Sequence, residues 1–251
     1  MIIFKYIFFL FKKMSADLKE LIEQSLFDPS TEDRSFSSDF ERIHKHHIDS
    51  LVLFTAITDK AIVYFHGNYG NVTWYTDKMK KIQKKYPNCD IWCFDYPGFG
   101  RSKGKPNSES LINSAYTFLN MIQKQYKQWE WVCESIGGGI AMGVLSHDTY
   151  VLDYLPTHIT IVNGFRSIGT MANDRSSVPN AKHIVKKLGF ELNTYKWILK
   201  AKDRYKDKMP NFSIIRCLGD TDIPIKHSQD LAEAAGVQLT VLNGTNRDFD
   251  F

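Results

Sequence analysis

Ser135 stands where a run of apolar residues meets a run of glycines, in residues 131–143, which read WVCESIGGGIAMG. A strand that ends at this serine and a helix that begins after it would form a nucleophile elbow, a strained turn that lifts the hydroxyl above the sheet. In this turn the backbone N–H of Ile136 would bind an oxyanion. Cys133 and Gly137 occupy the crowded positions two before and two after the serine; cysteine is larger than the glycine usual there. The alternative is a serine that only caps a helix.

A second turn follows an apolar run at residues 61–65 and reads HGNYGN. Gly67 and Gly70 let the backbone turn tightly with its N–H groups free. Such donors can hold the oxyanion of an acyl-transfer intermediate. The alternative is an ordinary strand-to-helix turn in which Asn71 or Thr73 caps the helix.

The third loop, residues 94–106, reads FDYPGFGRSKGKP. Its G-x-G is not followed by the helix-opening glycine of a dinucleotide site, so the sequence predicts no bound cofactor. We interpret this loop as a wall of the site.

The elements that position these turns alternate along the chain. Apolar or β-branched runs of strand length lie between amphipathic stretches such as 111–122, 74–86 and 227–235. Alternation of this kind predicts an α/β domain with a parallel sheet covered on both faces. The expected strands start near residues 51, 61, 90, 129, 158, 212 and 238.

Taken together, the ordered motifs HGNYGN, DYPGFGRS and ESIGGG resemble the α/β-hydrolase superfamily, in particular the small-lidded branch that includes eukaryotic protein depalmitoylases. The resemblance implies a mostly parallel central sheet flanked by helices, with a short helical lid at about 169–202. The hydrolase domain would cover residues 50–251, after an N-terminal apolar segment and a polar, mobile stretch in residues 1–49.

The resemblance also assigns roles. It makes Ser135 the nucleophile and places the oxyanion hole at the backbone N–H groups of Asn68 and Ile136. The acid of the triad should follow a late strand, where the sequence reads RCLGDTDIPI. Asp222 matches the family position best, with Asp220 as the second choice. Proteins of this family need neither cofactor nor metal.

The catalytic histidine is the departure from the family. The family places it after the last strand, where this chain reads LNGTNRDFDF, with Asn246 and Arg247 at the expected position. A serine hydroxyl is a poor nucleophile without a base. Three accounts stay open: a degenerate hydrolase that keeps a pocket, an incomplete or altered C-terminus, or a substitute histidine, His227 or His183.

The expected function is therefore a serine hydrolase that acts on an ester or thioester through an acyl-enzyme. The alternative is a catalytically dead binding or scaffolding protein with the same fold. Of the 251 residues, 43% are hydrophobic, which is enough for the core of one domain. The net charge of +4 gives no dominant field for nucleic acid, so the expected partner is a small-molecule or acylated substrate.

The cysteines and histidines show no metal-site spacing. The four cysteines lack C-x-x-C spacing, and HKHH at residues 44–47 is read as a polar loop rather than a metal site. Free thiols favour a reducing compartment, so we expect a cytoplasmic protein. The apolar run at residues 2–11 is shorter than the roughly 20 residues that span a bilayer. A membrane contact through this run and a true start at Met14 are equal alternatives.

Overall fold

The computed structural model describes residues 17–244 apart from residues 18, 25, 56 and 176–178. Its main sheet has the strand order β10-β9-β8-β7-β4-β6-β3-β2. The strands from β10 to β6 are parallel, whereas β3 runs antiparallel to both β6 and β2. The predicted mostly parallel sheet is therefore confirmed. The strands are β2 (Phe40–Lys45), β3 (Ile48–Leu53), β4 (Lys60–Phe65), β6 (Asp90–Phe94), β7 (Gln128–Glu134), β8 (His158–Val162), β9 (Asn211–Cys217) and β10 (Leu239–Leu242).

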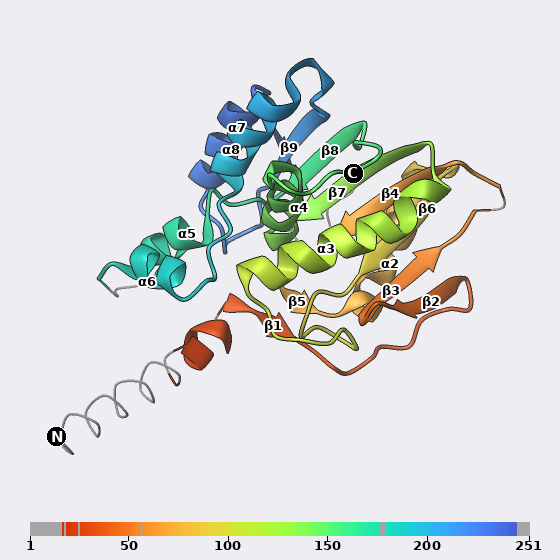
Figure 1. Ribbon diagram of the computed structural model, residues 1–251, viewed down its shortest axis with the longest axis horizontal. Coiled ribbons are helices and arrows are strands. Elements are labelled where there is room, and N and C mark those ends of the chain that lie inside the picture. The colour runs from red at the N-terminus through yellow and green to blue at the C-terminus, as the bar shows by residue number, and fades with distance from the viewer. Residues whose placement is uncertain (1–16, 18, 25, 56, 176–178, 245–251) are drawn as a thin grey trace.

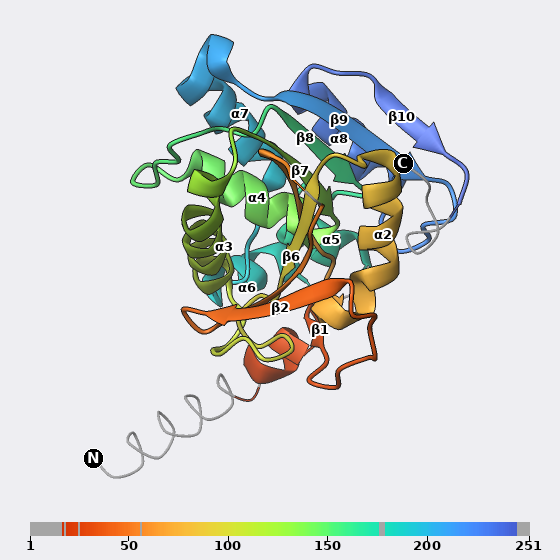
Figure 2. The same cartoon turned by 90° about the vertical axis from the view of Figure 1, so that its right-hand side faces the viewer.

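Helices cover both faces of this sheet (Figures 1 and 2). The turn η1 (Val72–Tyr75) and α2 (Thr76–Lys85) lie on one face. On the other face, α3 packs against α4, α4 against α7, and α7 against α8. These four helices are α3 (Ser108–Ile122), α4 (Ile136–Ser146), α7 (Thr194–Tyr205) and α8 (Ile225–Ala235). Two short helices, α5 (Ile168–Arg175) and α6 (Ala181–Lys187), lie apart from this layer (Figure 1).

The period of two along each strand sends alternate side chains to the two faces. In β4, Val63 and Phe65 join the larger core under α3 and α4, while Ile62 and Tyr64 join the core under α2. All four are buried, as expected for a central strand covered on both sides.

The sheet begins earlier in the chain than expected. Strand β2 starts at Phe40, before the predicted domain boundary at residue 50, and pairs with β3 through a hairpin. His46 and His47 form its turn with positive φ angles of 53° and 63°. Polar residues fill this edge strand, so the sequence carries no strong strand pattern there. HKHH is thus part of a hairpin, and the described residues include no cluster of metal-binding side chains.

The range 169–202, predicted as a lid, contains helices with different packing. Helix α7 buries Ile198 and Ala201 and packs against α4 and α8, so it belongs to the layer that covers the sheet. Among the described residues of this range, α5 and α6 lie outside that layer, and α5 contributes residues to the cavity described below whereas α6 does not. The amphipathic pattern of α7 could not distinguish a lid helix from a packing helix.

The localisation predicted above, cytoplasmic with a membrane contact through residues 2–11 as one of two alternatives, needs correction. In the described part of the chain, no helix combines the length and hydropathy needed to cross a bilayer. Even α3 has only 15 residues, against about 20 for a membrane-spanning helix. Residues 2–11 and Met14 lie outside the described residues.

Candidate active site

Ser135 lies in a sharp turn between β7 and α4. Its backbone has φ 53° and ψ −115°, a region that residues other than glycine rarely adopt. The Ser135 N–H donates to the Val162 carbonyl at 3.0 Å, which ties the turn to the neighbouring strand. Ser135 is partly exposed, whereas the residues on either side of it are buried. The turn therefore holds the serine above the sheet in a strained conformation.

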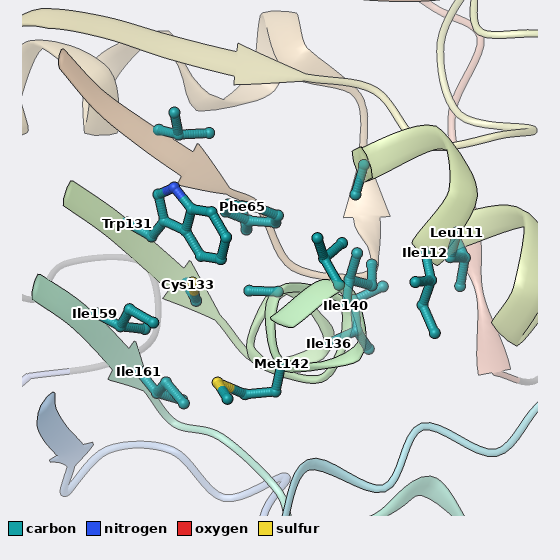
Figure 3. Close-up of a cluster of buried hydrophobic side chains, with 14 of the residues drawn as sticks. Phe65, Leu111, Ile112, Trp131, Cys133, Ile136, Ile140, Met142, Ile159 and Ile161 are labelled. Carbon is teal, nitrogen blue, oxygen red and sulfur yellow. The ribbon is translucent and has the colours of Figure 1, made fainter. Parts of the chain in front are cut away.

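Helix α4 anchors this turn in the core. Figure 3 shows Ile136 and Ile140 directed towards Leu111 and Ile112 of α3, and Met142 beside Ile161 of β8. Because every residue of α4 is buried, its start has little freedom to move.

Cys133, where the strict pattern has glycine, is fully buried in the same core. Burial raises the pKa of its thiol, so it stays a neutral, small apolar residue.

Asn68 and Ile136 line the same cavity as Ser135. Ile136 is the first residue of α4, so its N–H has no acceptor within the helix. Asn68 is held from two sides: its side-chain amide donates to the Leu26 carbonyl at 2.9 Å, and its own carbonyl accepts from the Asp28 N–H at 3.0 Å. Within the described residues, neither the Asn68 nor the Ile136 N–H donates to a protein acceptor.

A buried carboxylate stands next to the serine. Glu134 accepts a hydrogen bond from the Tyr64 hydroxyl and forms an ion pair with Lys78 of α2. Burial, and then the Glu134 charge, raise the pKa of Tyr64, which keeps its hydroxyl protonated as a donor. Glu134 and Lys78 both line the cavity, and sequence reasoning missed both. The only available signal was an acidic residue at the end of a buried strand.

The two candidate acids behave differently. Asp220 is buried and accepts hydrogen bonds from Arg216, at 2.7 Å, and from the backbone N–H of Asp222 and Ile223. Asp220 therefore shapes the turn. The side chain of Asp222 is 77% exposed, lines the cavity, and lies 3.5 Å from Arg175 of α5. Of the two, only Asp222 shares the cavity with Ser135.

The substitute histidines do not reach this cavity. His227 is buried; its Nδ1 accepts the Arg166 N–H at 3.0 Å, and its Nε2 lies 2.9 Å from Asp174 of α5. Both ring nitrogens are engaged, so His227 does not fit the role of a base. His183 is exposed on α6, and neither histidine lines the cavity. Positions 246 and 247, where the family places the base, lie outside the described residues.

His66 begins the turn at residues 66–71, called the oxyanion turn here for its predicted role, and contacts the loop at residues 94–106. The His66 ring stacks between Tyr75 and Tyr96, at centroid distances of 4.9 and 4.3 Å. No residue of 94–106 lines the cavity, so the interpretation of this loop as a wall of the site is wrong. Its aromatic residues support the oxyanion turn from below.

The cavity above Ser135 has a volume of about 720 Å³. Its apolar lining comes mainly from α5 and the loops beside it, and η1 contributes Trp74 and Tyr75. The charged lining comes from several elements: Arg34, Asp77, Lys78, Glu134, Arg175 and Asp222. Two further residues, Leu26 and Arg34, come from the N-terminal stretch that the sequence placed outside the domain. The apolar residues are Leu26, Ile136, Phe165, Ile168, Met171, Ala172 and Ile223.

Comparisons with known proteins support the fold of this chain. A family model described as the α/β-hydrolase fold matches residues 60–160, which include the oxyanion turn and Ser135. The chain has the α/β-hydrolase fold. The solved esterase Pf2001 of Pyrococcus furiosus is similar to it, with a TM-score of 0.62 and 13% identity over 88% of this chain and 89% of that one. Mouse α/β hydrolase domain-containing protein 10 gives a TM-score of 0.55 and 13% identity, over 84% of this chain and 91% of that one.

Sequence relatives of this chain match shorter segments. The uncharacterized protein R595 of Acanthamoeba polyphaga mimivirus is 28% identical over 133 residues, which is 49% of this chain and 44% of that protein. The uncharacterized protein YfhR of Escherichia coli K12 is 31% identical over 62 residues, 25% of this chain and 21% of that one. The chain thus spans less than half the length of these curated relatives.

Proposed function

We propose that this α/β hydrolase is a serine hydrolase that cleaves an ester or thioester through an acyl-enzyme on Ser135. The observation that carries the proposal is the strained backbone of Ser135, at φ 53°, on the wall of a large cavity. Strain of this kind persists where the surrounding structure enforces it and is common at reactive groups. The esterases among the solved neighbours support the same class of reaction.

In the proposed reaction, Ser135 Oγ attacks the carbonyl carbon of the substrate and gives its proton to a base. The carbonyl oxygen becomes an oxyanion, which accepts hydrogen bonds from the Asn68 and Ile136 N–H groups. Collapse of the intermediate expels the alcohol or thiol, which takes the proton, and leaves an acyl-serine. Water then attacks the acyl-serine and releases the acid. Asp222 orients the base and stabilises its charged form.

The base is the member of the triad that the described residues do not supply. The family position falls at Asn246 and Arg247, and arginine stays protonated near neutral pH. The proposal therefore concerns the serine, its oxyanion donors and the acid, each of which has a described position.

The test is labelling of the folded protein by a fluorophosphonate probe, which reacts with activated serines. We expect the wild-type protein to be labelled and Ser135→Ala to be unlabelled. Ser146→Ala removes a hydroxyl from the far end of the same helix α4 and should label like the wild type. Folded wild-type protein that takes up no label, or label that persists in Ser135→Ala, would refute the proposal.

A second candidate function is a binding protein that keeps the pocket without turnover. The observation in its favour is that no histidine lies among the described residues that line the cavity. This candidate predicts that the fluorophosphonate probe does not label Ser135 and that the pocket still binds acyl ligands. Titration with a non-hydrolysable ester analogue would measure that binding.

A further inference from the structure

Residues 26–34, named here the N-terminal strap, contribute Leu26 and Arg34 to the cavity wall. Strand β1 (Asp28–Pro29) pairs in parallel with β5 (Tyr69–Gly70), which lies within the oxyanion turn. The Asn71 side-chain amide donates to the carbonyls of Ser30, at 3.0 Å, and Glu32, at 2.9 Å. The strap is therefore bound to the turn by backbone and side-chain hydrogen bonds.

Arg34, at the end of this strap, is fixed against Trp74. Its backbone N–H donates to Thr73 Oγ1 at 2.8 Å, and its guanidinium carbon lies 3.6 Å from the centroid of the Trp74 ring. The Trp74 indole N–H donates in turn to the Glu32 carbonyl at 3.0 Å. A Cβ at Gly70 would lie 2.8 Å from the Trp74 ring, so the indole occupies space that only glycine leaves open. A guanidinium stacked on an aromatic face keeps the N–H groups at its edge available to a ligand.

The Arg34 guanidinium differs from the other cations of the cavity in its acidic partners. Two other cations line the cavity, and each has a carboxylate partner: Lys78 with Glu134, and Arg175 with Asp222. Within the described part of the chain, no carboxylate forms an ion pair with Arg34. The remaining acid of the lining, Asp77, lies in the first turn of α2, where the helix dipole stabilises a negative charge.

The apolar residues of the cavity lining indicate the second part of such a ligand. Phe165, Ile168 and Met171 contribute apolar surface from α5 and its flanking loop, and Ile223 adds to it from the Asp222 turn. Apolar surface of this kind favours an alkyl or acyl chain. The cavity thus combines an apolar region with one arginine that has no acidic partner among the described residues.

We propose that Arg34, stacked on Trp74, binds the phosphate or carboxylate group of an amphiphilic substrate whose apolar chain contacts α5. Guanidinium groups bind both oxyanions through paired, charge-assisted hydrogen bonds. The inference rests on the proposed function only where it calls the ligand a substrate, since binding at Arg34 needs no reaction at Ser135.

The test measures the affinity of alkyl ligands that cannot react. Decyl phosphate, decanoate and the uncharged decyl dimethyl phosphate are titrated into the full-length protein by calorimetry, below their micellar concentrations. We expect at least one of the two anions to bind about tenfold or more tightly than the neutral ligand, a margin typical of one charge-assisted contact. If only decyl phosphate binds tightly, the site is assigned to a phosphate group. If both anions bind tightly, it is a general site for oxyanions.

Three variants locate the effect. Arg34→Gln should abolish the preference for anions and leave the affinity for the neutral ligand unchanged, and Trp74→Leu should weaken the preference. Arg101→Gln is the matched control, because Arg101 is an exposed arginine paired with Asp33 outside the cavity lining. Equal affinity for charged and neutral ligands, or an unchanged preference in Arg34→Gln, overturns the proposal. Fluorophosphonate labelling is scored separately, so failure of the serine hydrolase proposal remains distinguishable.

Discussion

The Cβ atom that any other residue would carry at Gly137 would lie 2.3 Å from the carbonyl oxygen of Phe65. Phe65 ends β4 just before the turn that contains Asn68, and Gly137 follows Ser135 by two residues. The close approach of α4 to β4 therefore sets the spacing between the serine and the oxyanion turn. The pairing of Phe65 with Cys133 across β4 and β7 fixes the same spacing from within the sheet.

Gly137→Ala is expected to separate α4 from β4, because a backbone carbonyl cannot move aside as a side-chain end can. We expect the free energy of unfolding to fall by about 2–4 kcal/mol, as for other overpacked core positions, and fluorophosphonate labelling to be lost. Gly189→Ala is the control, since its Cβ would meet nothing within 4 Å and only its φ of +82° opposes alanine. The free energy of unfolding should fall by about 1 kcal/mol in Gly189→Ala. Urea unfolding measures both, and equal losses would contradict the steric explanation.

Strain at Ser135 can be measured by comparing two variants that both lack the hydroxyl. Glycine adopts φ 53° and ψ −115° far more easily than alanine. Ser135→Gly should therefore be more stable than Ser135→Ala by about 1–2 kcal/mol in urea unfolding. Elsewhere in a helix or strand the order is reversed, so an alanine variant at least as stable as the glycine variant would show that the turn is unstrained.

Substitution of Asp220 should reduce stability, whereas substitution of Asp222 should reduce activity. Asp220→Asn leaves Arg216, whose side chain is 6% exposed, without its carboxylate partner, and should cost about 3 kcal/mol of stability. Asp222→Asn changes a side chain that is 77% exposed, so its stability should stay within about 0.5 kcal/mol of the wild type. Ester hydrolysis should fall in Asp222→Asn if this carboxylate orients the base. A stable Asp220→Asn protein would contradict the structural role given to Asp220.

Asp95, under the oxyanion turn, should make stability depend on pH. Burial raises the pKa of Asp95 above its usual 3.8, although His66 opposes the shift. The folded state therefore binds the proton more tightly than the unfolded state, and ionisation costs stability as the pH rises through the raised pKa. Asp95→Asn, which resembles the protonated acid, should become more stable relative to the wild type as the pH rises above the unfolded pKa of 3.8. Urea unfolding of both proteins as a function of pH measures the difference.

Asp33→Asn is the control, because the pH dependence of its stability relative to the wild type should have the opposite sign. A hydrogen bond from Arg42 lowers the pKa of Asp33, so its charged form stabilises the folded state above the unfolded pKa of 3.8. That stabilisation is lost as the pH falls through the lowered pKa. The wild type should therefore lose its advantage over Asp33→Asn as the pH falls. A parallel pH dependence of the two variants would refute the assignment at Asp95.

Local sequence patterns were enough to predict much of the fold and the turn at Ser135. The apolar runs that became β4, β6, β7, β8 and β9 are continuous because both faces of these strands are buried. The change from such a run to glycines at Ser135 is likewise a local signal. Strand β2 carried no such signal, because an edge strand with polar residues is stabilised by its pairing with β3 and not by its own composition.

By itself, the sequence determined the α/β class, the strand-to-helix turn at Ser135 and the aspartate pair after β9, because each depends on residues close together in the chain. Only the tertiary structure decided that Leu26 holds Asn68, that Arg34 stacks on Trp74, and that Asp222 rather than Asp220 reaches the cavity. These contacts join segments about 40 residues apart, or depend on which side of a turn faces the solvent. Neither periodicity nor spacing encodes such contacts, since they form only when the sheet brings its loops together.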